Sequence, residues 1–185
     1  MPNWYHNTLT VRGKPQEIAA FKLKAAQNVH NEEPGPINFH NFVPVPNALL
    51  NYGGAERTAG DFIISPSRQL SAEEQNAQAA KEARIEWERE NWGCKWGAIR
   101  SELEPSEDDT KAVFHFDTAW GPPMRFLMKV AQLNTELLFI LYSYSAEDCR
   151  WFDVAFWSDY CHVKDRTWLA EAQRMCTCGA FNNKK

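Results

Sequence analysis

Four residues near the C-terminal end, Cys161, His162, Cys176 and Cys178, are of the types that bind zinc. Their spacing fits a zinc site poorly, because C-x-C is tighter than the usual C-x-x-C and because adjacent Cys and His seldom both point at one metal. Five cysteines in a chain without an export signal favour reduced thiols over a disulfide framework. We therefore predict no cofactor, and these four residues are the alternative zinc ligands.

Pro2 offers a second kind of chemistry. Removal of Met1 would leave an N-terminal proline, and its secondary amine can act as a base or a nucleophile, as in tautomerases. Tautomerase chains are much shorter, however, and no cationic partner for such an amine is evident in this sequence. An enzyme that uses Pro2 is therefore an alternative that we do not favour, and we assign no catalytic residue.

The segment 91–97, Asn-Trp-Gly-Cys-Lys-Trp-Gly, suits neither an ordinary helix nor an ordinary strand. It lies between a predicted helix and a predicted strand, so it sets the angle at which one enters the other. Tryptophans at the start of the first strand and the end of the third should converge near it. Core packing is the favoured interpretation, because a buried Trp contributes a large apolar area. The alternative is a platform for a peptide or for nucleic-acid bases, formed by Trp4, Asn91, Trp92, Lys95, Trp96 and Trp120.

Phe114 and Phe116 stand two apart on a predicted strand, as stacking aromatics do on RNA-reading sheets. The glycine and basic residues that normally surround such a pair are missing from the neighbouring sequence. A formal charge of −4 also argues against a protein that mainly coats duplex DNA. Core packing of both rings is preferred, and single-stranded nucleic-acid binding through sheet-face aromatics is the alternative.

The elements that must position these residues alternate between strands and helices. Alternating and apolar runs predict strands at 4–12, 97–104, 111–118, 137–143 and 150–160. Helical spacing predicts helices at 15–28, 71–91, 123–134 and 165–176. The second helix opens with an S-x-x-E capping box, formed by Ser71 and Glu74. Its faces are mostly Ala, Glu, Lys and Gln, so it should be largely solvated and touch the body near its C-terminal end.

Strand, helix, strand, strand, helix, strand is the element order of a ferredoxin-like α+β sandwich, an antiparallel sheet with helices on one face. The 185 residues are enough for a single domain with one hydrophobic core. We predict one domain over residues 1–185, with a helical insertion at about 47–92 and a C-terminal strand-helix extension at about 146–181.

Four blocks of sequence occur in a fixed order: Pro2-Asn3-Trp4 with Asn7, Leu9, Val11 and Gly13; Phe42-Val43-Pro44-Val45-Pro46; Asn91-Trp92-Gly93-Cys94-Lys95-Trp96; and Phe116-Asp117-Thr118-Ala119-Trp120-Gly121-Pro122-Pro123. Together they resemble the YubB-like family, which is carried by bacterial plasmids and phages. The similarity spans roughly residues 2–145. It implies a ferredoxin-like domain and a mobile-element context, while the function of the family is largely unknown and no catalytic residue is implied.

We therefore expect a small, non-enzymatic accessory protein of a phage or plasmid that binds a protein encoded by the host or by the element. Nucleic acid is the less favoured partner. No apolar run approaches the roughly 18 residues that a membrane span needs, and the N-terminus lacks the pattern of a secretory signal. We therefore expect a cytoplasmic protein without a membrane partner. The sequence does not predict the oligomeric state.

Two acidic runs offer one more interaction surface. Most such runs are solvated faces. In a phage or plasmid protein, an acidic protrusion could also imitate the phosphates of nucleic acid and occupy the basic groove of a host enzyme. The runs comprise Glu102, Glu104, Glu107, Asp108 and Asp109 in a hairpin turn, and Glu73, Glu74, Glu82, Glu86, Glu88 and Glu90 in the helix before it.

Overall fold

The computed structural model describes residues 3–27, 35–50, 71–145, 147 and 150–156. Five strands in this part of the chain form one antiparallel sheet in the order β2-β3-β1-β4-β5. The elements are β1 (Trp4–Arg12), α1 (Pro15–Ala25), the 3₁₀ turn η1 (Phe39–Asn41), α2 (Asn47–Leu50), α3 (Ala72–Asn91), β2 (Lys95–Leu103), β3 (Lys111–Ala119), α4 (Met124–Leu133), β4 (Leu138–Ser145) and β5 (Arg150–Phe156).

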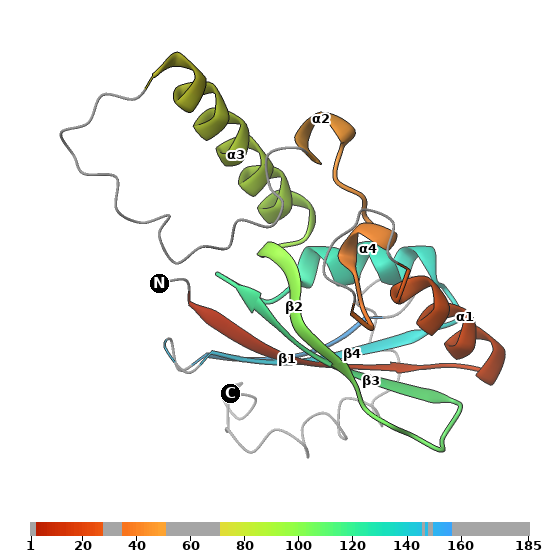
Figure 1. Ribbon diagram of the computed structural model, residues 1–185. Coiled ribbons are helices and arrows are strands. Elements are labelled where there is room, and N and C mark those ends of the chain that lie inside the picture. Colours follow the sequence, from red (N-terminus) through yellow and green to blue (C-terminus); the bar gives the residue numbers. More distant parts are fainter. Residues whose placement is uncertain (1–2, 28–34, 51–70, 146, 148–149, 157–185) are drawn as a thin grey trace.

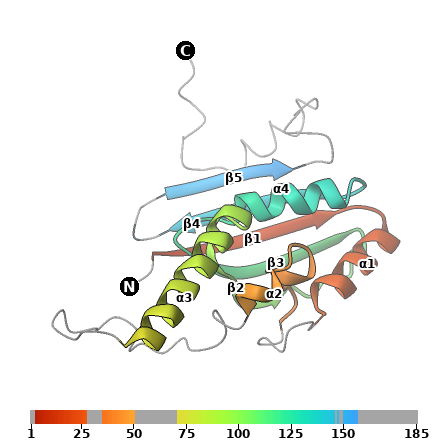
Figure 2. The same ribbon diagram turned by 90° about the horizontal axis from the view of Figure 1, so that it is seen from above.

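The first four strands give the molecule its fold class. β1 and β3 are central, β2 and β4 flank them, and α1 and α4 cover the same face of the sheet (Figure 1). This is the arrangement of a ferredoxin-like α+β sandwich, so the predicted fold class is confirmed. β5 pairs with β4 and confirms the predicted additional strand (Figure 2). The helix predicted at 165–176 lies outside the described residues.

The alternation of side chains in β1 explains why the sheet has one covered and one open face. Successive side chains of a strand point to opposite faces. Tyr5, Leu9 and Val11 are buried against the helices, whereas His6 and Arg12 are exposed. In β1 the covered side chains are therefore mostly apolar. The opposite face, which none of the described helices covers and which we call the open face, carries polar and charged side chains of β1.

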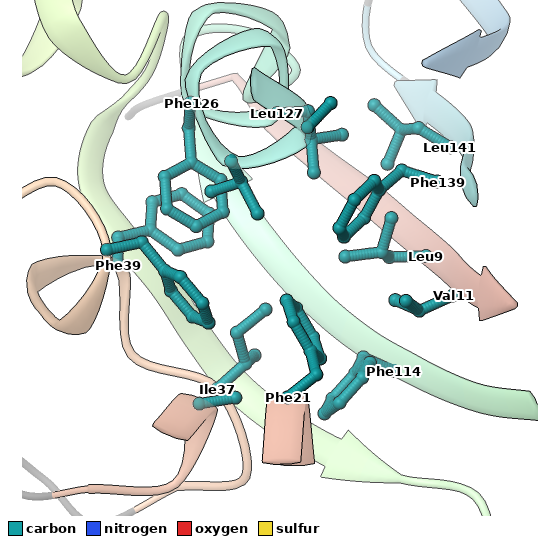
Figure 3. Close-up of a cluster of buried hydrophobic side chains, with 14 of the residues drawn as sticks. Leu9, Val11, Phe21, Ile37, Phe39, Phe114, Phe126, Leu127, Phe139 and Leu141 are labelled. Carbon is teal, nitrogen blue, oxygen red and sulfur yellow. The ribbon is translucent and has the colours of Figure 1, made fainter. Parts of the chain in front are cut away.

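Aromatic rings from five elements, α1, η1, β3, α4 and β4, fill the space between the sheet and the helices (Figure 3). Phe39 stacks on Phe126 of α4, with ring centroids 3.8 Å apart, and Phe21 of α1 lies 5.9 Å from Phe114. Phe114 and Phe116 are 0% and 2% exposed. The prediction that both rings belong to the core is confirmed, and neither ring is available to stack on a base.

Helix α3 projects from the body and meets it near its C-terminal end, as the sequence predicts (Figure 1). The capping box is present, because Ser71 Oγ accepts from Glu74 N at 3.2 Å and Glu74 Oε2 accepts from Ser71 N at 2.8 Å. One detail of the prediction is wrong. Glu88, grouped with the solvated acids, is 1% exposed, and Arg84 is also buried. Arg84 and Glu88 pair with each other within α3 and each also bonds to the body, Arg84 Nη1 to the carbonyl of Leu49 at 3.4 Å and Glu88 Oε2 to Trp96 N at 2.9 Å. Trp87 adds an apolar contact with the core.

Among the described helices, none combines the length and the apolar composition required to cross a lipid bilayer.

Candidate functional site

Three tryptophans and two cations come together where β1 and β2 begin and β3 ends. The rings of Trp4 and Trp96 have centroids 6.2 Å apart. Lys95 Nζ lies 3.9 Å from the centroid of the Trp96 ring and 4.7 Å from that of Trp120. The guanidinium carbon of Arg100 lies 4.9 Å from the centroid of Trp4. We call these five residues the tryptophan corner.

The tryptophan corner combines buried supports with exposed binding groups. Lys95 is only 6% exposed, so its ammonium group stays among the rings that it contacts. Trp120 is 47% exposed, and 61% of the Arg100 side chain is exposed. The Trp120 ring and the Arg100 guanidinium group are thus exposed to solvent beside the buried Lys95. This arrangement suits the binding of apolar and anionic groups.

Backbone strain is concentrated in the tryptophan corner. Trp96, Arg100 and Trp120 have φ angles of 71°, 52° and 72°, and they are the non-glycine residues with positive φ in the described chain. Each such residue costs roughly 1–3 kcal/mol and persists only where surrounding contacts fix it. Strand β2 also shifts register against β3 on both sides of Ile99. Because of these irregularities, successive side chains of β2 do not simply alternate between the two faces of the sheet.

A buried polar network holds Trp96 in its strained conformation. Glu88 Oε2 accepts a hydrogen bond from Trp96 N at 2.9 Å, and Glu88 Oε1 accepts one from Arg84 Nε at 2.7 Å. On the other side, Arg84 Nη2 lies 3.2 Å from His40 Nε2. The ring of His40 in turn packs edge-on against Trp92, with centroids 4.9 Å apart. Helix α3 therefore positions the tryptophan corner through a carboxylate that has no contact with solvent.

A second network fixes the backbone around Trp120. The amide of Trp120 donates to the carbonyl of Asn3 at 2.8 Å, and Thr118 Oγ1 donates to the carbonyl of Gly121 at 2.7 Å. Asn7 Nδ2 donates to Thr118 Oγ1 at 3.0 Å, and Ser143 Oγ donates to Asn7 Oδ1 at 2.7 Å. Side chains of three neighbouring strands thus determine the turn that presents Trp120.

Acidic groups on the open face border the tryptophan corner. Asp117 Oδ2 pairs with Arg100 Nη2 at 2.7 Å, and Asp117 Oδ1 lies 2.6 Å from His6 Nδ1. Further along the same strand, His115 Nε2 lies 3.4 Å from Glu104 Oε2. The tryptophan corner therefore has two cationic side chains at its centre, and carboxylate and imidazole groups border it.

The structure separates the six residues that the sequence proposed as a binding platform. Trp4, Lys95, Trp96 and Trp120 belong to the tryptophan corner, but Trp92 does not. It is 1% exposed, packs edge-on against Phe39 at 5.7 Å and donates from Nε1 to the carbonyl of Val43 at 3.0 Å.

Asn91 also lies outside the tryptophan corner and forms hydrogen bonds with two helices. Its Nδ2 donates to the carbonyl of Trp87 at 2.8 Å, and its Oδ1 accepts from Lys129 Nζ at 2.5 Å. Asn91 therefore closes the last turn of α3 and joins it to α4.

Arg100 is the member of the tryptophan corner that sequence reasoning missed. It lies within a predicted strand, where a single arginine resembles any exposed strand residue. Its position against Trp4 depends on the shifted register of β2, and no local sequence pattern gave that shift.

The remaining candidates for chemistry give no reactive centre in the described chain. Burial raises the pKa of the Cys94 thiol, with the Glu88 carboxylate as a second cause, so this thiol stays neutral and unreactive. No group of three metal-binding side chains occurs among the described residues. Pro2 and the proposed zinc ligands Cys161, His162, Cys176 and Cys178 lie outside them.

Comparison with known proteins places few constraints on this chain. No protein-family model matches the sequence, and no curated protein matches it. Among solved structures, the chain is similar to a protein api92 from Yersinia pseudotuberculosis, described with the family model DUF1281. The TM-score is 0.43 and the sequence identity 8%, over 85% of this chain and 95% of that one.

Proposed function

We propose that this chain is a non-enzymatic interaction module that binds a protein partner through the tryptophan corner. The observation that carries the proposal is the coincidence of strain and exposure in one place. Arg100 and Trp120 hold costly left-handed backbone and are also well exposed. Strain of this kind collects at ligand-binding positions, where the surrounding structure keeps the binding groups in place before the ligand arrives.

The composition of the tryptophan corner fits a protein partner. Trp and Arg are enriched among the residues that dominate protein–protein binding energy, and they act best on a rigid base. Here the base is supplied by Glu88, Thr118 and Asn7, which are all buried. The four sequence blocks support a phage or plasmid context for this module, and we propose that it acts in the cytoplasm.

Single-stranded nucleic acid is the second candidate ligand for the same surface. Aromatic rings combined with arginine are common in channels for single strands. The specific observation in its favour is the guanidinium carbon of Arg100, which lies over the Trp4 ring, 4.9 Å from its centroid. Asp117 on the neighbouring strand β3 and Glu104 just after β2 would repel a phosphate backbone, and for this reason we prefer the protein partner.

A comparison of single variants tests the proposal. Tagged wild-type protein, Trp120→Ala and Leu23→Ala are used to capture partners from bacterial lysate, with and without nuclease. Leu23 is the matched control because it is a large apolar residue, 72% exposed, on α1. We expect a nuclease-resistant protein that wild-type and Leu23→Ala retain and that Trp120→Ala loses.

Two results would contradict the protein-binding proposal. Equal capture by all three proteins would show that the tryptophan corner is not the binding surface. Nuclease-sensitive capture that depends on Trp120 would instead assign the corner to nucleic acid.

A further inference from the structure

We propose that Arg100 is a preorganised receptor for a carboxylate, so that the protein partner presents an acidic side chain next to an apolar one. This inference rests on the proposed function and specifies the chemistry of the partner. It starts from the two contacts that hold the guanidinium. One is the Trp4 ring, 4.9 Å from the guanidinium carbon, and the other is Asp117, which pairs with Nη2 at 2.7 Å.

These two contacts leave part of the guanidinium open. The guanidinium carbon lies over the Trp4 ring and Asp117 engages one nitrogen, but 61% of the Arg100 side chain is exposed. A guanidinium group carries five N–H donors in a planar fork that matches a carboxylate in a bidentate pair. Because the flexible side chain is already ordered, binding an anion costs less conformational entropy than it would at a free surface arginine.

Local charge favours a single carboxylate over a phosphate chain. Asp117 contributes one negative charge directly beside Arg100, and it also contacts His6 at 2.6 Å. Glu102 lies opposite His115 in the register of β2 and β3, and Glu104 Oε2 lies 3.4 Å from His115 Nε2. A ligand with regularly spaced negative charges would meet this acidic border, whereas one acidic side chain can pair with Arg100 alone.

The apolar part of the partner follows from Trp120. Its ring is 47% exposed, and its position is fixed by the Lys95 ammonium group and the buried hydrogen bonds behind it. The binding groups of the corner thus run from an open aromatic ring at Trp120 to an open guanidinium at Arg100. A short extended segment with one apolar and one acidic side chain complements both ends.

Peptide selection on the full chain tests this inference. A display library of random dodecapeptides is selected on immobilised wild-type protein, and the best peptide is then titrated by fluorescence polarisation. We expect Asp or Glu to be enriched beside apolar residues in the selected peptides. Arg100→Gln should weaken binding about ten-fold, the usual size of a charge-assisted hydrogen bond. Arg100→Lys should give an intermediate loss, because it keeps the charge and loses the planar fork.

The matched control is Arg12→Gln, which makes the same change of charge at the far end of β1. It should bind the peptide as wild-type does. Replacing the acidic residue of the peptide by its amide should weaken binding to wild-type and change little for Arg100→Gln, because the two groups interact with each other. Circular dichroism and thermal unfolding show that each variant is folded.

The outcomes separate this inference from the proposed function. If selected peptides lose binding to Trp120→Ala but bind Arg100→Gln as well as wild-type, the interaction surface stands and the carboxylate receptor is wrong. Selection that returns no peptide, or peptides without acidic enrichment, also overturns the inference. Displacement of the peptide by a single-stranded oligonucleotide, with strong salt dependence, would overturn it in favour of nucleic acid.

Discussion

Trp92 and Trp96 are four residues apart and occupy two different environments. Trp92 is the C-cap of α3, with a φ of −105°, and lies in the core, with its ring centroid 5.7 Å from that of Phe39. Trp96 has a φ of 71° and lies at the surface among Trp4 and Lys95. The buried Trp92 has a negative φ, whereas the positive φ angles occur in the tryptophan corner, where Arg100 and Trp120 are exposed. The comparison indicates that the core around Trp92 stabilises the fold, and that the fold in turn stabilises the strained backbone of the tryptophan corner.

Removing the buried ring should have the largest effect on stability. Trp92→Ala leaves a large cavity against Phe39 and His40, so the free energy of unfolding should fall by roughly 3–5 kcal/mol. Trp120→Ala should lower it by about 1 kcal/mol or less, because the ring is half exposed. Urea denaturation followed by circular dichroism measures both. Similar losses for the two variants would break the distinction between the regions.

Glu88 connects the two regions, and its variant should affect both. Glu88→Gln removes the negative charge beside buried Arg84, and an uncompensated buried charge should lower stability by about 3 kcal/mol. It should also weaken the hydrogen bond to Trp96 N, so the backbone amide signal of Trp96 in ¹⁵N NMR spectra should shift or broaden. The control is Glu86→Gln, an exposed change two residues away on α3. A stable Glu88→Gln protein with an unchanged backbone amide signal of Trp96 would contradict this role.

The smallest expected effect concerns strain at Trp120. Glycine accepts a φ of 72° without steric cost, whereas alanine does not. Both variants remove the indole ring, so Trp120→Gly should be more stable than Trp120→Ala by about 1 kcal/mol. Both should lose partner binding equally. If alanine proves as stable as glycine at this position, the backbone there is not strained and the main support for the proposed binding site is lost.

Much of the fold could be predicted because local patterns and the required topology agree. The alternation around Leu9 and Val11, the capping box of Ser71 and Glu74, and the apolar stripe around Phe126 each indicate an element that the structure contains. The order of strands and helices then allows only a few topologies in which the helices cover one face of the sheet. The core positions of Phe114 and Phe116 follow from this order, since both rings face the helices.

The contacts of the candidate site were harder to predict. Glu88 looks like any other acid in a polar helix, and its burial depends on where α3 meets His40 and Trp96. Arg100 looks like an exposed strand residue, and its place beside Trp4 and Asp117 depends on the irregular register of β2. The partners of Arg100 come from distant parts of the chain, whereas Trp96, to which Glu88 bonds, is eight residues away across the turn from α3 into β2.

The sequence by itself determined the α+β class, the element order and the existence of an unusual segment at 91–97, because periodicity, capping and turn residues act over a few neighbouring positions. The tertiary structure decided which tryptophans are buried and which are exposed. It also decided that Lys95 and Arg100 lie on aromatic rings and that a buried carboxylate holds the strained backbone. The physical reason is that the contacts of Arg100 with Trp4 and Asp117 join residues far apart in sequence, and only the folded sheet brings them within contact distance.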